Sequence, residues 1–123
     1  MGAVNRVDIE RICPNCGNLV EFKVQFKYGN VWEDEYRIGD RLRWGRDFPD
    51  KPHAGQGDVG KPSTRQVVVY GIAEGCPNCG YSCGPDGELD YEVWVEDDQI
   101  VAVRPASGRY VFEREDPYLV LRE

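Results

Sequence analysis

The chain has 123 residues, 41% of them hydrophobic, and a formal net charge of −7 at pH 7. This length predicts a single domain over residues 1–123. The first residues lack the apolar stretch of a signal peptide, and charged residues interrupt every candidate membrane span of roughly 20 apolar residues. We therefore expect a soluble, cytoplasmic protein with no membrane partner, and the composition does not bear on its oligomeric state.

The first motif along the chain is Cys-Pro-Asn-Cys-Gly at residues 13–17, which recurs letter for letter at residues 76–80. Two cysteines separated by two residues can reach one metal ion from a single tight turn. The proline pre-sets φ for that turn, and the glycine can adopt φ > 0 after it. Zinc binds four such ligands as a tetrahedron. We therefore expect one structural zinc ion, with the ligands Cys13, Cys16, Cys76 and Cys79.

The two pentapeptides resemble the knuckles of zinc-ribbon and related zinc-knuckle proteins, in which two C-P-x-C-G turns at the tips of β-hairpins bind one zinc ion. The resemblance covers these motifs alone and implies a metal-binding β structure. Simple paired C-x-x-C motifs lie about 15–20 residues apart, whereas here residues 17–75 separate the two pairs. That insertion is long enough to hold several strands, so we expect zinc to staple the two ends of a larger β-sheet.

Other roles for these thiols are less favoured. A redox dithiol is unsupported because no βαβ pattern surrounds either pair. A catalytic zinc needs an open position and a nearby general base, but the only histidine, His53, lies in a Gly/Pro-rich stretch. Cys83 is either a substitute ligand or a small side chain with a free thiol. No Ser/His/Asp set or close acid pair can be argued, so we expect no enzymatic activity.

The chain after the first knuckle predicts strands. Residues 20–28 alternate between apolar and polar without a break, as in a half-buried antiparallel strand. Residues 29–30 predict a turn, and a second alternating run covers residues 36–44 with a bulge or bend at residues 39–40. One face of that run has Tyr36, Ile38, Leu42 and Trp44, and the opposite face has Arg37, Arg41 and Arg43.

Residues 45–65 are crowded with Gly, Pro and Asp and predict a long loop, mobile or ordered by a partner. The G-x-x-x-x-G-K pattern inside it is not a phosphate loop, because Pro62 stands where Ser or Thr is required. The apolar run at residues 66–73 predicts a central strand that leads into the second knuckle.

The rest of the chain predicts a hairpin at residues 91–95 and 99–103, and edge strands at residues 110–112 and 118–121. No stretch has a helical period. The expected fold is mainly β: a small antiparallel sheet or open barrel stapled by a two-knuckle zinc site.

Charge is unevenly distributed. Residues 1–73 hold 11 Lys and Arg against 10 Asp and Glu, whereas residues 74–123 hold 4 against 12. Residues 84–98 contain seven acids and no base, a pattern that suits a surface for a basic protein. The expected partner-binding residues are Asp86, Glu88, Glu96, Asp97 and Asp98. We expect a protein-interaction or inhibitor module, of which an acidic protein masking a basic active site, as toxin-neutralising immunity proteins do, is one form.

Nucleic acid is the alternative partner, because zinc ribbons often bind it. Arg37, Arg41 and Arg43 could contact phosphates. The negative net charge of the chain opposes that attraction. In addition, Tyr36 and Trp44 fall on the apolar face, away from the arginines, and so predict core residues rather than stacking platforms.

Overall fold

The computed structural model describes residues 4–47, 58–80, 90–112 and 117–123. Nearly all regular structure in these ranges is strand, which confirms the predicted mainly β fold. The strands are β1 (Asn5–Ile12), β2 (Leu19–Phe26), β3 (Gly29–Asn30), β4 (Glu35–Arg37), β5 (Asp58–Val59), β6 (Gln66–Ala73), β7 (Asp90–Glu96), β8 (Gln99–Pro105) and β9 (Tyr118–Arg122). A single 3-10 turn, η1 (Gly45–Asp47), is the helical element of the described residues.

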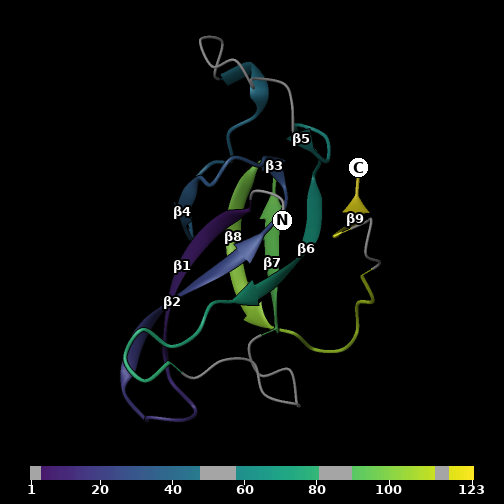
Figure 1. The fold of residues 1–123 in the computed structure, drawn as a ribbon. Helices are drawn as coiled ribbons and strands as arrows, with labels where there is room; N and C mark the ends of the chain where they lie inside the picture. Colours follow the sequence, from purple (N-terminus) through teal and green to yellow (C-terminus); the bar gives the residue numbers. More distant parts are fainter. Residues whose placement is uncertain (1–3, 48–57, 81–89, 113–116) are drawn as a thin grey trace.

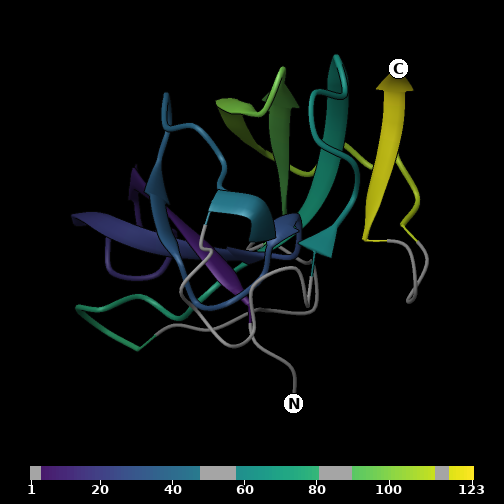
Figure 2. The same ribbon diagram turned by 90° about the horizontal axis from the view of Figure 1, so that it is seen from above.

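Seven strands form one sheet in the order β4-β1-β2-β6-β7-β8, with β9 also paired to β6. The sheet is strongly curled into an open half-barrel (Figure 1), and the view from above shows β9 beside β6 (Figure 2). Strands β3 and β5 form a separate two-stranded sheet. The core fills the inside of the curl, where alternate residues of each strand point.

Strands β1 and β2 form a long hairpin with eight antiparallel residue pairs, from Asn5–Phe26 to Ile12–Leu19. Alternate pairs point into the core, and Val7, Phe22 and Val24 are fully buried there. The alternation at residues 20–28 therefore predicted a real strand, although the ladder ends at Phe26.

Strand β6 is central, as predicted. One edge pairs with β7 over six residue pairs, and the other edge is shared by β9 and β2. The β2–β6 pairing covers only three residue pairs, at the carboxyl end of β6. At Gly71 the strands pack closely, since a Cβ there would lie 2.7 Å from Cγ1 of Val24. This short junction joins the two halves of the sheet.

The run at residues 36–44 is only partly a strand. β4 pairs with β1 in parallel, and the chain then bends at Gly39–Asp40, where we expected a bend. Beyond the bend it approaches β8, where the Ile100 N–H donates to the Asp40 carbonyl (2.9 Å). Of the four residues expected on the apolar face, Ile38 is 49% exposed because it lies next to this bend, and the buried ones are Tyr36, Leu42 and Trp44.

The segment expected to be a loop at residues 45–65 is partly structured. Residues 48–57, which include His53, lie outside the described residues. Around them, η1 is formed and β5 pairs with β3, so residues 29–30 form a short strand rather than a turn. The buried Tyr28 ring packs on Gly60, where a Cβ would lie 2.2 Å from the ring. Backbone packing that glycine permits therefore orders a segment that its composition marks as a loop.

The carboxyl-terminal part holds the predicted hairpin and one of the two predicted edge strands. β7 and β8 form the hairpin, and β9 forms the edge strand at residues 118–122. Residues 110–112 are not a strand. Their rings cover the outside of the sheet instead, with Phe112 against Tyr70 (centroids 5.6 Å apart) and Tyr110 against Trp94 (5.7 Å).

Candidate metal centre

The two knuckles meet at one end of the half-barrel. The first knuckle forms the turn between β1 and β2, and the second follows β6. Because β2 and β6 are neighbours in the sheet, these two loops lie side by side in both views (Figure 1 and Figure 2). The four sulfur atoms of Cys13, Cys16, Cys76 and Cys79 all lie within 4.8 Å of one another.

The sulfur spacing fits a tetrahedral metal ion. The Sγ atoms of Cys13 and Cys79 are 3.7 Å apart, and those of Cys16 and Cys76 are 3.9 Å apart. Four sulfurs bound to one ion at about 2.3 Å would be separated by about 3.8 Å. A disulfide would bring two sulfurs to about 2.05 Å, and all four cysteines are free thiols. The residues present therefore suit one four-coordinate metal ion.

Each knuckle is closed by the same backbone contact. The Gly17 N–H donates to the Cys13 carbonyl (3.0 Å), and the Gly80 N–H donates to the Cys76 carbonyl (2.8 Å). Both glycines have positive φ, +73° and +76°, so the role predicted for them is confirmed. In each knuckle the first cysteine is buried and the second is more accessible.

The asparagine of each knuckle reaches across to the other knuckle. The Asn15 side-chain amide donates to Sγ of Cys79 (3.4 Å), and the Asn78 amide donates to Sγ of Cys16 (3.6 Å). The motif predicted roles for the proline and glycine but none for asparagine. The sequence signal for this role was the asparagine at the third position of both motifs.

The environments of the thiols differ. Burial raises the pKa of the Cys13 thiol to about 11. The backbone N–H of Asn18, followed by the amide of Asn78, lowers the pKa of Cys16 to about 6. Hydrogen bonds from N–H groups favour a thiolate, whereas burial disfavours it. A bound cation holds all its cysteine ligands as thiolates. At Cys16 the protein's own N–H groups already stabilise the thiolate, whereas at Cys13 the cation would have to do so.

A salt-bridged cluster lies at the β2–β6 junction, at the end of the β1–β2 hairpin that is far from its knuckle. Glu74 follows β6 and accepts hydrogen bonds from Arg6 Nε (2.5 Å) and Gln25 Nε2 (3.0 Å). Burial alone would raise the pKa of Glu74, but these bonds and the Arg6 charge together lower it. The cysteines and Glu74 thus both connect the end of β6 to β1 and β2. The staple was expected at the two ends of the sheet, whereas the sulfurs lie between loops that flank the neighbouring central strands β2 and β6.

The acids expected to bind a partner have different surroundings. Asp86 and Glu88 lie outside the described residues. Glu96 and Asp97 are exposed at the β7–β8 turn. Asp98 is only 4% exposed, and its carboxylate accepts the Ser63 N–H at 2.9 Å. Asp97 and Asp98 both have positive φ, as a two-residue hairpin turn requires. Asp98 therefore shapes the turn, and its side chain does not contribute to the acidic surface.

The arginines of the alternative hypothesis are exposed. Arg37, Arg41 and Arg43 all face solvent, as the alternation predicted. Although it is exposed, Arg43 also contacts the protein itself: its guanidinium lies 3.3 Å from the Asp34 carboxylate and over the Tyr36 ring. The rings of Tyr36 and Trp44 are buried, so they offer no stacking surface to a nucleic acid on this face.

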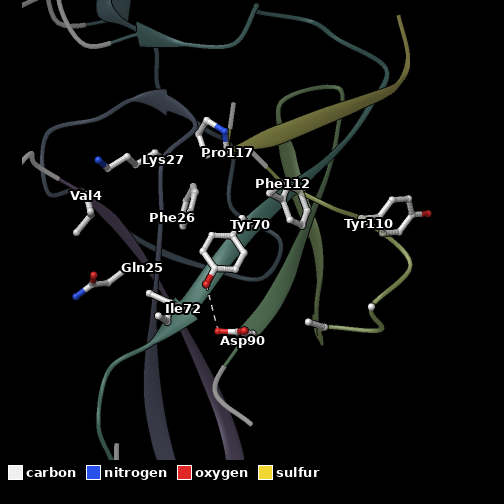
Figure 3. Close-up of a pocket in the computed structure, with 12 residues that line it drawn as sticks. Val4, Gln25, Phe26, Lys27, Tyr70, Ile72, Asp90, Tyr110, Phe112 and Pro117 are labelled. Atoms are coloured by element: carbon white, nitrogen blue, oxygen red, sulfur yellow. Dashed lines mark hydrogen bonds between the residues drawn. The ribbon is translucent and has the colours of Figure 1, made fainter. Parts of the chain in front are cut away.

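A separate hollow of about 730 Å³ opens where β2 and β9 leave β6. Aromatic and apolar side chains, among them Phe26, Ile72 and Phe112, line much of it (Figure 3). The Tyr70 hydroxyl donates to the Asp90 carboxylate at 3.2 Å within it (Figure 3). Gln25, Lys27 and Asp90 also line the hollow, so its lining is mixed.

Comparison with protein-family models, curated proteins and solved structures finds no match. In the described ranges, no helix has the length and apolarity needed to cross a membrane. Cys83, the fifth cysteine, lies outside those ranges. The interpretation of the metal centre therefore depends on its geometry.

Proposed function

We propose that the chain is a small zinc-binding protein in which one structural zinc ion supports a protein-interaction module. The supporting observation is the cluster of four thiols with sulfurs at tetrahedral spacing. Four cysteine sulfurs in this geometry suit zinc or an iron–sulfur centre, and the paired C-P-x-C-G turns favour zinc. The ligands are Cys13, Cys16, Cys76 and Cys79.

The role of the zinc is structural because four protein ligands leave no open position for water or substrate. The site lies beyond the end of a short ladder of three residue pairs between β2 and β6, the neighbouring strands that join the two halves of the sheet. By joining residues 13–16 to residues 76–79, the ion would hold the two halves of the sheet together. Metal binding and folding would then be coupled.

The interaction role follows from charge. The net charge is −7, and Glu96 and Asp97 are exposed on a tight turn. A basic protein is the proposed partner, and inhibition of such a protein is one form of this role. Nucleic acid is the second candidate, supported by the exposure of Arg37 and Arg41. Thiols that must stay reduced to hold zinc also suit the cytoplasm.

Native mass spectrometry of protein purified without chelator tests the metal. We expect one zinc per chain, and loss of zinc when any one of the four ligands becomes Ser. Cys83→Ser is the matched control and should retain zinc. Protein without metal, or a Cys83→Ser variant without zinc, would contradict the assignment.

Affinity capture from cell lysate, at low and high salt and with and without nuclease, tests the partner class. A protein retained at low salt and released at high salt is the expected result. Captured material that disappears with nuclease would favour nucleic acid.

A further inference from the structure

The outer face of the β1–β2 hairpin has four cross-strand pairs. They alternate with the buried pairs of the core, so their side chains point away from it. In order toward the metal knuckle, the pairs are Arg6–Gln25, Asp8–Lys23, Glu10–Glu21 and Ile12–Leu19.

The two pairs far from the knuckle are neutralised within the fold. Arg6 and Gln25 both donate to Glu74. Lys23 donates to Asp8 at 3.1 Å and to a second carboxylate, from β4, at the same distance. This half of the face therefore needs no outside partner.

The two pairs next to the knuckle are different. Glu10 faces Glu21, and both are exposed. The apolar pair beyond them is open to solvent, with Ile12 63% and Leu19 67% exposed. The Cys13 N–H bonds the Asn18 carbonyl one pair further on. Because hydrogen-bonded and non-hydrogen-bonded pairs alternate, both of these pairs occupy non-hydrogen-bonded positions, where side chains approach most closely.

We propose that Glu10, Ile12, Leu19 and Glu21, which we call the knuckle face, bind a partner protein that presents a lysine or arginine beside an apolar side chain. A cation placed between the carboxylates offsets their repulsion, and the adjacent apolar group covers the exposed pair. A phosphate backbone would meet two carboxylates here, so the face suits a protein. This names the surface for the interaction role proposed above and rests on that proposed function.

The knuckle face is also well supported by the fold. Ile12 is followed directly by the buried ligand Cys13, and the neutralised pairs continue the same hairpin on the other side. A surface held at both ends loses little conformational freedom on binding, which favours affinity.

Thermal unfolding of the zinc-loaded protein tests the repulsion. Glu10→Gln should raise the Tm by about 1–4 °C, because it removes one member of a like-charge pair. Asp8→Asn is the matched control from the same strand and face. It should lower the Tm, since Asp8 is salt-bridged to Lys23. A lower Tm for Glu10→Gln would overturn the proposal that the carboxylates oppose each other.

Binding is tested by following backbone amide resonances of the zinc-loaded protein during peptide titration. The probe is acetyl-Gly-Leu-Lys-Leu-Lys-Gly-amide, and two matched peptides replace Leu by Ser or Lys by Glu. We expect the probe to shift amides at residues 10–12 and 19–21, and the matched peptides to bind at least about tenfold more weakly. Equal binding of the Ser peptide would reduce the effect to charge attraction and overturn the proposal.

Variants separate this surface from the rest of the molecule. Glu10→Gln/Glu21→Gln and Ile12→Ser/Leu19→Ser should each weaken the probe about tenfold or more. Glu33→Gln/Glu123→Gln makes the same charge change at two other exposed carboxylates and should have no effect. Glu96→Gln/Asp97→Asn tests the acids of the β7–β8 turn: if this variant loses binding and the knuckle-face variants retain it, this inference is wrong while an acidic-surface function survives. Native mass spectrometry of each protein reports zinc separately, so absence of metal would instead count against the metal assignment.

Discussion

The reciprocal asparagine contacts have a measurable consequence for metal affinity. Asn15→Ala removes an N–H···S bond to Cys79, and Asn78→Ala removes one to Cys16. Loss of an outer-shell hydrogen bond costs about 10–100-fold in metal affinity. Both asparagines are exposed, so water replaces part of each bond and the lower end applies. We expect zinc affinity to fall about tenfold in each single variant and up to about 100-fold in the double variant.

Competition with a chromophoric zinc chelator measures the affinity. The cobalt(II)-substituted protein gives a second readout that general loosening of the fold would not change in the same way. Removal of an N–H···S bond raises the energy of the sulfur lone pair, so the sulfur-to-cobalt charge-transfer band should move to longer wavelength. The two single variants should behave alike, because the two contacts have similar lengths, 3.4 and 3.6 Å.

Asn18→Ala is the matched control. Asn18 is exposed beside the first knuckle and bonds Cys13 through its backbone carbonyl, a contact that alanine keeps. Its zinc affinity and cobalt spectrum should match those of the parent protein. The reasoning is refuted if the Asn15→Ala/Asn78→Ala protein holds zinc as tightly as the parent, or if Asn18→Ala loses as much affinity.

Three further changes test the junction and the turn by chemical denaturation. Gly71→Ala should destabilise the fold by about 1–3 kcal/mol, because the added Cβ would lie 2.7 Å from Val24. Glu74→Gln should destabilise at pH 7, where the carboxylate bonds Arg6. Folding lowers the pKa of Glu74. The stabilisation from its ionised carboxylate is therefore fully present above the unfolded-state pKa of about 4.3. It is lost as the pH falls through the lower pKa of the folded protein. Asp98→Ala should cost about 1–3 kcal/mol, because it removes the carboxylate that accepts the Ser63 N–H.

Each of these has a control. Val24→Ala makes room at the junction, so Gly71→Ala should cost less in that background than alone. Glu96→Gln removes an exposed acid and should leave the free energy of unfolding unchanged at pH 7 and at low pH. This control separates the local effects of Glu74 and Asp98 from an effect of net charge. Additive costs for the two junction variants, or a Glu74→Gln effect that grows toward low pH, would contradict the packing and linkage arguments.

Two strands were predictable from sequence. Residues 20–28 alternate between apolar and polar, and residues 66–73 form an apolar run rich in β-branched side chains. β2 covers most of the first segment and β6 covers the second. The metal ligands could likewise be nominated because a C-x-x-C spacing has few other uses in a reduced protein. Such signals are local, because each strand and each cysteine pair can be read from its own segment.

The remaining features depend on partners distant in sequence. β1 was not predicted because several of its residues are polar. Among its inward residues, buried Asn5 donates to the carbonyls of Tyr28 and Asn30. Arg11 lies over the rings of Phe22 and Tyr91. The burial of Asp98 likewise depends on Ser63, 35 residues away. An acidic run therefore cannot be equated with an acidic surface until the hydrogen-bond donors to each carboxylate are known.

Zinc K-edge X-ray absorption of the protein as purified tests the central claim most directly. We expect one zinc per chain with four sulfur neighbours at about 2.3 Å and no nitrogen or oxygen bound to it. Three sulfurs with a lighter atom would mean that one of the four cysteines is not a ligand and that an open, non-structural position exists. Protein that purifies folded and without metal would contradict the claim that zinc holds the β2–β6 junction.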